Sequence, residues 1–250
     1  MNKFDPNNFD PDNEIQRVTE WTQEWFHKNK DMYDKCIVPM EFRPESFLTA
    51  AICARAIGKH NITAVIIANG KKENIDALIR QTDAMCITPR IINISGTMEN
   101  ALSVLPGYKF DEMDDPLHGI PQETAQLLES AVATSIIYAT AEQDKKTAVA
   151  NTMSLTDEWL GTGAKYGHYQ GHLAPLLGYT DSEIEQMCHA AGIRLPTMVR
   201  DACADCIIRR RNNCAIINDT VLWQKEKKHS DNMHKHAPIP RCIPSIYPHE

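Results

Sequence analysis

The sequence predicts an α/β fold with a doubly wound, mostly parallel sheet, an N-terminal helix and an irregular C-terminal extension. Apolar segments of strand length alternate three times with segments of helical periodicity, a pattern typical of a parallel sheet covered by helices. Residues 62–68 are apolar almost throughout, as expected for a strand that is buried on both faces. A hydrophobic share of 42% supports a normally packed core.

The individual elements follow from this alternation and from local signals. Residues 14–28 carry apolar side chains at every third or fourth position, which predicts a helix that packs on the main domain or on a second subunit. Thr180 and Glu183 have the spacing of a capping box and predict a helix that begins there. In chain order, the other expected elements are a strand at 36–40, a helix at 48–57, a strand at 62–68, a helix at 73–86, a strand at 89–94, helices at 97–105 and 123–142, and a strand at 147–152.

Composition divides the chain into three parts. Residues 1–13 are rich in Asn, Asp and Pro and are expected to form a flexible arm. Residues 14–200 carry the pattern of strands and helices and are expected to form one α/β domain. Residues 201–250 contain cysteines, a basic run and a tail rich in His and Pro, and are expected to form the irregular extension.

Charge and hydropathy narrow the class of protein. A net charge of −7 argues against nonspecific binding to nucleic acid. No apolar run approaches the roughly 20 residues that span a bilayer, and the first residues lack the apolar core of a signal peptide. We therefore expect a cytoplasmic protein without a membrane segment. The eight cysteines are then more typical of buried thiols or metal ligands than of disulfides.

The turn at residues 41–46 joins the first predicted strand to its helix. Proteins of the α/β class usually bind an anion at such a position, because the first helical N–H groups have no partner. Pro44 suits the first turn of the helix. The turn contains no glycine, however, and a phosphate cradle needs backbone conformations that Phe, Arg and Pro resist. The position therefore predicts a nucleotide site, while its residues do not form an ordinary phosphate loop.

A family resemblance appears in residues 151–167, which read Asn-Thr-Met-Ser-Leu-Thr-Asp-Glu-Trp-Leu-Gly-Thr-Gly-Ala-Lys-Tyr-Gly. This stretch resembles the ammonia-dependent NAD synthetases, where Gly-Thr, an acidic metal ligand and a glycine precede Lys-Tyr-Gly-Asp-Gly-Gly. Residues 36–68 are similar to the family's first strand, phosphate-loop helix and second strand. The resemblance covers roughly residues 14–197. It implies the adenine nucleotide alpha hydrolase-like fold of the N-type ATP pyrophosphatases, and a homodimer.

The resemblance also implies an activity with ATP and Mg²⁺ as cofactors: adenylation of a carboxylate, followed by displacement of AMP by ammonia. Glu45 stands where the family has a metal-binding Asp, and Asp157 where it has a second metal carboxylate. Both are therefore expected to be catalytic and to bind Mg²⁺, which commonly uses one or two carboxylates together with phosphate oxygens. For Asp157, the acidic first turn of a short helix is an alternative explanation.

Four further residues are expected to contact the nucleotide. The family's phosphate loop reads Ser-Gly-Gly-x-Asp-Ser, and among residues 41–46 only Ser46 matches it. Arg43 could bind phosphate as a guanidinium, and Thr152 and Lys165 match the family near the nucleotide. A salt-bridged, solvated turn formed by Glu41, Arg43 and Glu45 is an equally good interpretation.

At two positions this chain lacks a positive charge that the family has in its pocket. Asp181 stands where the family usually has a lysine, and Thr134 stands about where the family has an arginine that contacts ATP. Loss of one transition-state donor alone can cost about 100- to 1000-fold in rate. A catalytically inactive pseudoenzyme, in which the fold serves binding or assembly, is therefore an alternative to the ligase.

The C-terminal cysteines suggest a third alternative. Cys203 and Cys206 have the spacing of a zinc knuckle, and Cys188 and Cys214 could complete four thiolate ligands for Zn²⁺. Free thiols explain the same pattern equally well. Residues 203–209 also resemble the zinc segment of the 7-cyano-7-deazaguanine synthases, although Arg200 replaces a cysteine of that pattern. This resemblance implies an enzyme with structural zinc.

Overall fold

The computed structural model describes residues 9–69, 72–109, 117–155, 157 and 171–193. In these residues, the centre of the molecule is a parallel sheet with the strand order β3-β2-β1-β4. The strands are β1 (Lys35–Pro39), β2 (Ile62–Ala68), β3 (Pro89–Asn93) and β4 (Thr147–Val149). The predicted α/β fold with a parallel sheet is confirmed.

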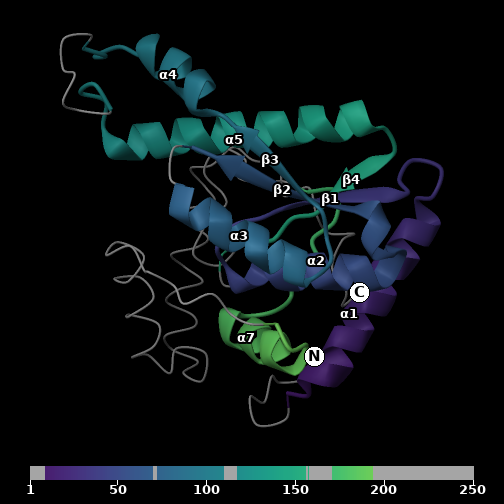
Figure 1. The fold of residues 1–250 in the computed structure, drawn as a ribbon. Helices are drawn as coiled ribbons and strands as arrows, with labels where there is room; N and C mark the ends of the chain where they lie inside the picture. Colours follow the sequence, from purple (N-terminus) through teal and green to yellow (C-terminus); the bar gives the residue numbers. More distant parts are fainter. Residues whose placement is uncertain (1–8, 70–71, 110–116, 156, 158–170, 194–250) are drawn as a thin grey trace, which may run out of the picture.

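Helices cover both faces of the sheet (Figure 1). The helices α2 (Pro44–Ile57) and α3 (Lys72–Ala84) lie on one face, and α5 (Gln122–Asp144) lies on the other. The short helix α4 (Ser95–Ser103) packs against α5, and the 3-10 helix η2 (Lys59–Asn61) connects α2 to β2. This arrangement makes the sheet doubly wound.

Alternating side chains of β1 supply the two sides of the core. Cys36 and Val38 join the large cluster beneath α2, whereas Ile37 packs with Ile137 and Ala141 of α5. The chain thus buries both faces of a central strand, which explains why the strand segments are apolar without alternation.

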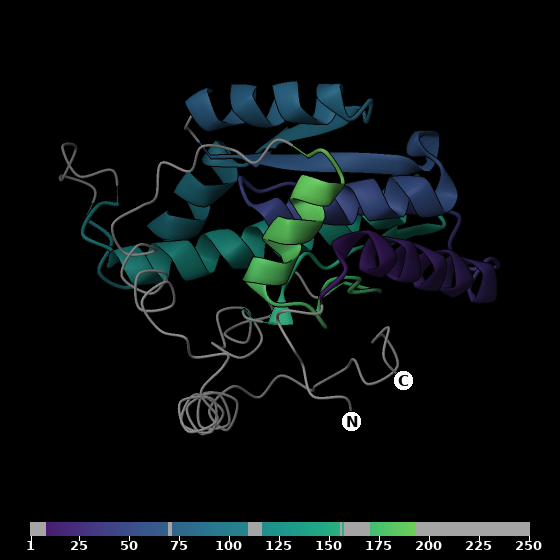
Figure 2. The same ribbon diagram turned by 90° about the horizontal axis from the view of Figure 1, so that it is seen from below.

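Two further helices form an outer layer on α2. Helix α1 (Pro11–Lys28) packs along α2, and α7 (Asp181–Ala190) contacts both of them; Figure 2 shows α7 beside α1. Helix α1 begins at Pro11, earlier than the predicted residue 14, because the side chain of Asp10 accepts a hydrogen bond from the Asn13 N–H. The remainder of the predicted arm, residues 1–8, and the extension at 201–250 lie outside the described residues.

Backbone contacts extend the sheet beyond β4. Ala150 forms a parallel bridge with Leu173, and the His172 N–H donates to the carbonyl of Val149 at 2.7 Å. Gly171 makes this approach sterically possible, since a Cβ at this position would lie 2.8 Å from the carbonyl oxygen of Val149. None of the helices in the described part of the chain is long and apolar enough to cross a membrane.

The capping box predicted at Thr180 is present. The backbone N–H of Thr180 donates to the Glu183 carboxylate at 2.6 Å, and the first turn of α7 begins at the next residue. Burial raises the pKa of Glu183, which is consistent with a carboxylate enclosed by the start of the helix. The cap fixes where α7 begins, and therefore where Asp181 lies.

Candidate functional site at the carboxyl edge of the sheet

Neighbouring strands bring two distant segments together at one edge of the sheet. β1 and β4 are parallel partners, with Ile37 opposite Val149. The turn at residues 40–43 and the segment after residue 150 therefore leave the sheet side by side. In parallel α/β sheets, ligands bind at this carboxyl edge.

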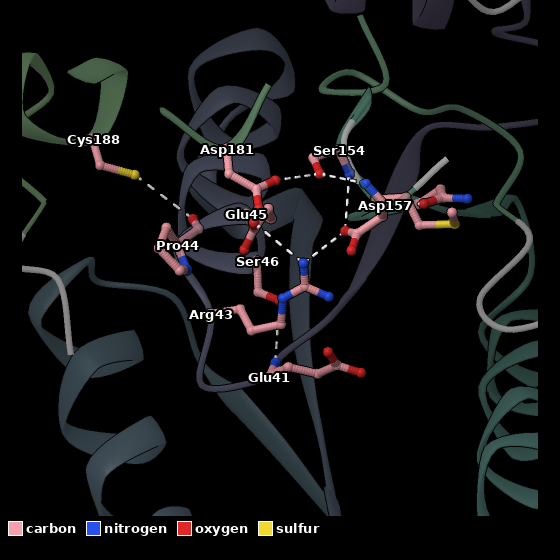
Figure 3. A network of polar contacts seen from close by, with 11 residues as sticks. Glu41, Arg43, Pro44, Glu45, Ser46, Ser154, Asp157, Asp181 and Cys188 are labelled. Carbon is pink, nitrogen blue, oxygen red and sulfur yellow. Dashed lines mark hydrogen bonds and ion pairs between the residues drawn. The ribbon is translucent and has the colours of Figure 1, made fainter. Parts of the chain in front are cut away.

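Arg43, the last residue of the turn after β1, places its guanidinium between two carboxylates (Figure 3). Nη2 of Arg43 lies 2.6 Å from Oδ2 of Asp157 and 3.2 Å from Oε1 of Glu45. The side chains of Glu45 and Asp157 are only 6% and 8% exposed, whereas that of Arg43 is 36% exposed. We call these three residues the edge network.

Burial and charge act in opposite directions within the edge network. Burial raises the pKa of Glu45, the positive charge of Arg43 opposes that shift, and the negative charge of Asp181 adds to it. For Arg43, burial alone would lower the pKa, but the carboxylates of Asp157, Glu45 and Glu41 raise it. The guanidinium is therefore held firmly in its charged form.

Backbone contacts hold the turn in place. Oγ of Ser46 accepts a hydrogen bond from the Glu41 N–H at 3.2 Å, and the Ser46 N–H donates to the carbonyl of Arg43 at 3.2 Å. Ser46 is itself buried. The second carboxylate oxygen of Glu45, Oε2, is buried and has no hydrogen-bond partner in the part of the chain that the structure describes.

Ser154 connects the edge network to α7. Its Oγ accepts from the Asp157 N–H at 3.0 Å and donates to Oδ1 of Asp181 at 2.6 Å. The backbone N–H of Ser154 in turn donates to Oδ2 of Asp157 at 3.3 Å. At the other end of α7, Sγ of Cys188 lies 3.7 Å from the carbonyl of Pro44. Asp157 is thus positioned by its own turn as well as by Arg43.

A pocket of about 350 Å³ adjoins the turn on the side of α5. Its walls are mainly apolar near the sheet and polar along the helix. The lining consists of residues 39–42, Val65 and Ile67 of β2, Leu78 of α3, and Gln126, Glu129, Ser130 and Ala133 of α5. The size falls within the range of about 300–1,000 Å³ for small-molecule sites.

The sequence matches the family model described as NAD synthase over residues 14–211. The chain belongs to the NAD synthase family. Among solved structures, an NH3-dependent NAD synthetase from Campylobacter jejuni in complex with the nitrate ion is 16% identical, with a TM-score of 0.70; the match covers 94% of this chain and 99% of that one. No curated protein sequence matches this chain.

Two other structures have the same fold at similarly low identity. NMN synthetase from Francisella tularensis is 14% identical, with a TM-score of 0.67, over 94% of this chain and 100% of that one. NAD+ synthetase from Burkholderia pseudomallei is also 14% identical, with a TM-score of 0.66, over 93% and 92%. The resemblance to NAD synthetases and the adenine nucleotide alpha hydrolase-like fold implied by it are confirmed.

The NAD synthase fold brings three of the predicted site residues into direct contact, namely Arg43, Glu45 and Asp157. Ser46 lies beneath them, with its hydroxyl engaged by the turn. Thr152 is buried in the segment that leaves β4. Lys165 lies outside the described residues, as do Cys203, Cys206 and Cys214.

Cys188, the fourth proposed zinc ligand, is buried against Pro44, the first residue of α2. Burial raises the pKa of its thiol to about 12, which disfavours the thiolate that zinc binds. Within the described ranges, no group of three or more His, Cys, Asp or Glu side chains could hold a metal ion. The zinc site itself stays a prediction, because its other three ligands are outside those ranges.

The family implies Mg²⁺, and the described carboxylates do not fit it as they stand. Oxygen atoms of Glu45 and Asp157 converge as Mg²⁺ ligands would, but both approach Nη2 of Arg43. A guanidinium already supplies the positive charge between them. Ser154, which fixes Asp157, was not identified from the sequence. Its spacing from Asp157 is that of a helix N-cap, a local signal that could have found it.

Proposed function

We propose that this protein is an ATP-dependent amide ligase of the NAD synthase type, which adenylates a carboxylate that ammonia then attacks. The observation that carries the proposal is the pocket beside the turn between β1 and α2, in a chain that belongs to this family. Ligands of parallel α/β sheets bind at this edge. The geometry of the pocket therefore supports a nucleotide as its occupant.

The two kinds of wall suit the two parts of a nucleoside. Val65, Ile67 and Leu78 offer an apolar surface for a planar base. Gln126 and Ser130 of α5 add side chains that donate or accept hydrogen bonds. A nucleoside in this pocket would direct its phosphates toward the turn at residues 40–43 and the start of α2.

The residues of the turn would then have distinct roles. The first N–H groups of α2 would face the phosphates, because a helix N-terminus favours negative charge. Ser46 would position the turn rather than touch the nucleotide, since its Oγ binds the Glu41 N–H. Thr152 and Lys165 complete the proposed nucleotide contacts, from the segment after β4.

Product formation tests the ligase directly. The purified chain is given ATP, Mg²⁺, ammonia and the deamido precursor of NAD or of NMN, the products named for the similar structures. We expect AMP and pyrophosphate in equal amounts, with amide formation that requires ammonia. AMP release without any ammonia-dependent product would contradict the proposed reaction.

A matched pair of variants links the activity to the pocket. Ser130→Trp places an indole in the pocket, and we expect it to raise the Kd for ATP at least about tenfold. Ser135→Trp makes the same change on an exposed position of α5 outside the pocket lining, and should leave the Kd within about twofold. Equal effects of the two variants would contradict the assignment of the pocket.

A second candidate function is nucleotide binding without catalysis. The observation that favours it is that Arg43 is paired with two carboxylates rather than open to phosphate. Calorimetry separates the candidates: a ligase should bind MgATP at least about tenfold more tightly than adenosine, whereas a pseudoenzyme should bind both about equally.

The oligomeric state and the compartment are part of the proposal. We propose a cytoplasmic homodimer, on the basis of the family to which the chain belongs. Light scattering at micromolar concentration should give twice the chain mass of 28.2 kDa. A monomer at all concentrations would contradict the dimer without bearing on the ligase.

A further inference from the structure

We infer that Arg43 takes, within the chain itself, the place of a divalent cation between Glu45 and Asp157. The pair therefore binds no metal ion as long as the guanidinium is present. Removing that side chain would convert the pair into a divalent-cation site. The inference concerns metal binding by the nucleotide-free protein and does not depend on the proposed ligase activity.

The geometry is that of a bridging cation. A single atom, Nη2 of Arg43, approaches Oε1 of Glu45 and Oδ2 of Asp157 at 3.2 and 2.6 Å. The two oxygens thus converge on one point, as they would on an ion (Figure 3). A divalent ion at that point would have to displace the guanidinium.

Charge makes that displacement unfavourable. The carboxylates are almost completely buried, and buried carboxylates need a positive partner. Arg43 provides one from the adjacent turn, at a fixed place in the chain, and it retains its charge at all ordinary pH values. A metal ion next to it would meet repulsion in an environment that screens charge poorly.

Contacts that do not involve Arg43 also hold Asp157, and the start of α2 fixes the position of Glu45 in the chain. Asp157 accepts from the Ser154 N–H at 3.3 Å, and its own N–H donates to Oγ of Ser154 at 3.0 Å. Glu45 lies in the first turn of α2, where its buried Oε2 has no hydrogen-bond partner among the described residues. The pair should therefore remain in place after Arg43 is truncated, with the buried Oε2 of Glu45 available to a hard cation.

Manganese provides the test, because Mn²⁺ prefers carboxylate oxygens and is readily counted by its paramagnetic resonance signal. The full chain without nucleotide is titrated with Mn²⁺ as wild type, Arg43→Ala, and the double variant Arg43→Ala with Asp157→Asn. Arg90→Ala is the matched control, since Arg90 pairs with a single carboxylate, that of Asp144, at 2.6 Å. The Arg90→Ala variant lacks an arginine but does not leave two buried carboxylates without their positive partner.

We expect Arg43→Ala to bind about one Mn²⁺ per chain, with a Kd at least about tenfold below those of wild type and Arg90→Ala. The added Asp157→Asn change should abolish that gain. A folded Arg43→Ala variant that shows no gain overturns the inference.

If Arg43→Ala does not fold, Mn²⁺ binding by the wild-type chain tests the inference. Wild type should show no Mn²⁺ binding that Glu45→Gln or Asp157→Asn removes. Binding by wild type that either variant removes would overturn the inference, because the metal would then share the carboxylates with Arg43.

Discussion

Two arginines in this molecule each connect segments that lie far apart in the sequence, and their surroundings differ. In the edge network, Arg43 meets Asp157 across 114 residues. In a second network, which we call the helix network, Arg17 of α1 donates to the Glu14 carboxylate and, at 2.9 Å, to the hydroxyl of Tyr179. The Tyr179 hydroxyl also donates to Glu14 at 2.7 Å.

The balance of charge separates the two networks. In the helix network, the contacts among the described residues join the Glu14 carboxylate to the Arg17 guanidinium and to Tyr179, which stays neutral because burial raises its pKa. In the edge network, one guanidinium faces two buried carboxylates, and the charge of Asp181 acts on the same site. The helix network ties α1 to the segment before α7, whereas the edge network, among the described residues, sets two carboxylates against one guanidinium beside a pocket.

The largest expected effect is a difference in stability between Arg43→Ala and Arg17→Ala. Removing Arg43 deprives two buried carboxylates of their positively charged partner, and we expect the free energy of unfolding to fall by about 3 kcal/mol. Removing Arg17 leaves the partly exposed Glu14, at a cost of about 1 kcal/mol. Urea denaturation in a chelating buffer measures both, and equal losses would break the proposed distinction between the networks.

A medium effect is expected when one hydroxyl is removed from each region. Ser154→Ala and Tyr179→Phe each delete a side-chain link between distant segments, and each should cost about 1–1.5 kcal/mol of stability. Only Ser154→Ala should also weaken the binding of ATP, because Ser154 holds the segment after β4, which carries the proposed nucleotide contact Thr152, against α7. Calorimetry checks this, and an equal loss of affinity in Tyr179→Phe would contradict the separate roles.

Sequence reasoning recovered the fold because the fold depends on local signals. The apolar strand segments and the Thr180–Glu183 capping box act over a few residues. The salt bridge between Arg43 and Glu45, one of two interpretations of the turn, is equally local. The contact of Arg43 with Asp157 was not predicted, since it depends on the register in which β1 pairs with β4. No spacing in the sequence specifies that register.

The smallest expected effect is a pH dependence of the free energy of unfolding that arises from the edge network. Glu45 has a pKa raised above the ordinary 4.5, chiefly because it is buried. The folded chain thus holds this proton to higher pH than the unfolded chain does. The stabilising contribution of Glu45 is therefore complete below pH 4.5 and is lost as the pH rises through the raised value.

Glu45→Gln should remove this pH dependence. We expect the variant to exceed wild type in stability by up to about 1 kcal/mol at neutral pH, and to lose that advantage in acid. Glu24→Gln is the control with the opposite sign, because Lys28 lowers the pKa of the exposed Glu24. Urea midpoints of wild type and both variants, measured from below pH 4.5 to neutral pH, give the stability of each chain as a function of pH. A Glu45→Gln variant that is less stable than wild type at neutral pH would mean that the ion pair with Arg43 outweighs the cost of burying the Glu45 carboxylate. The opposite charges of the edge network would then compensate one another as well as those of the helix network do.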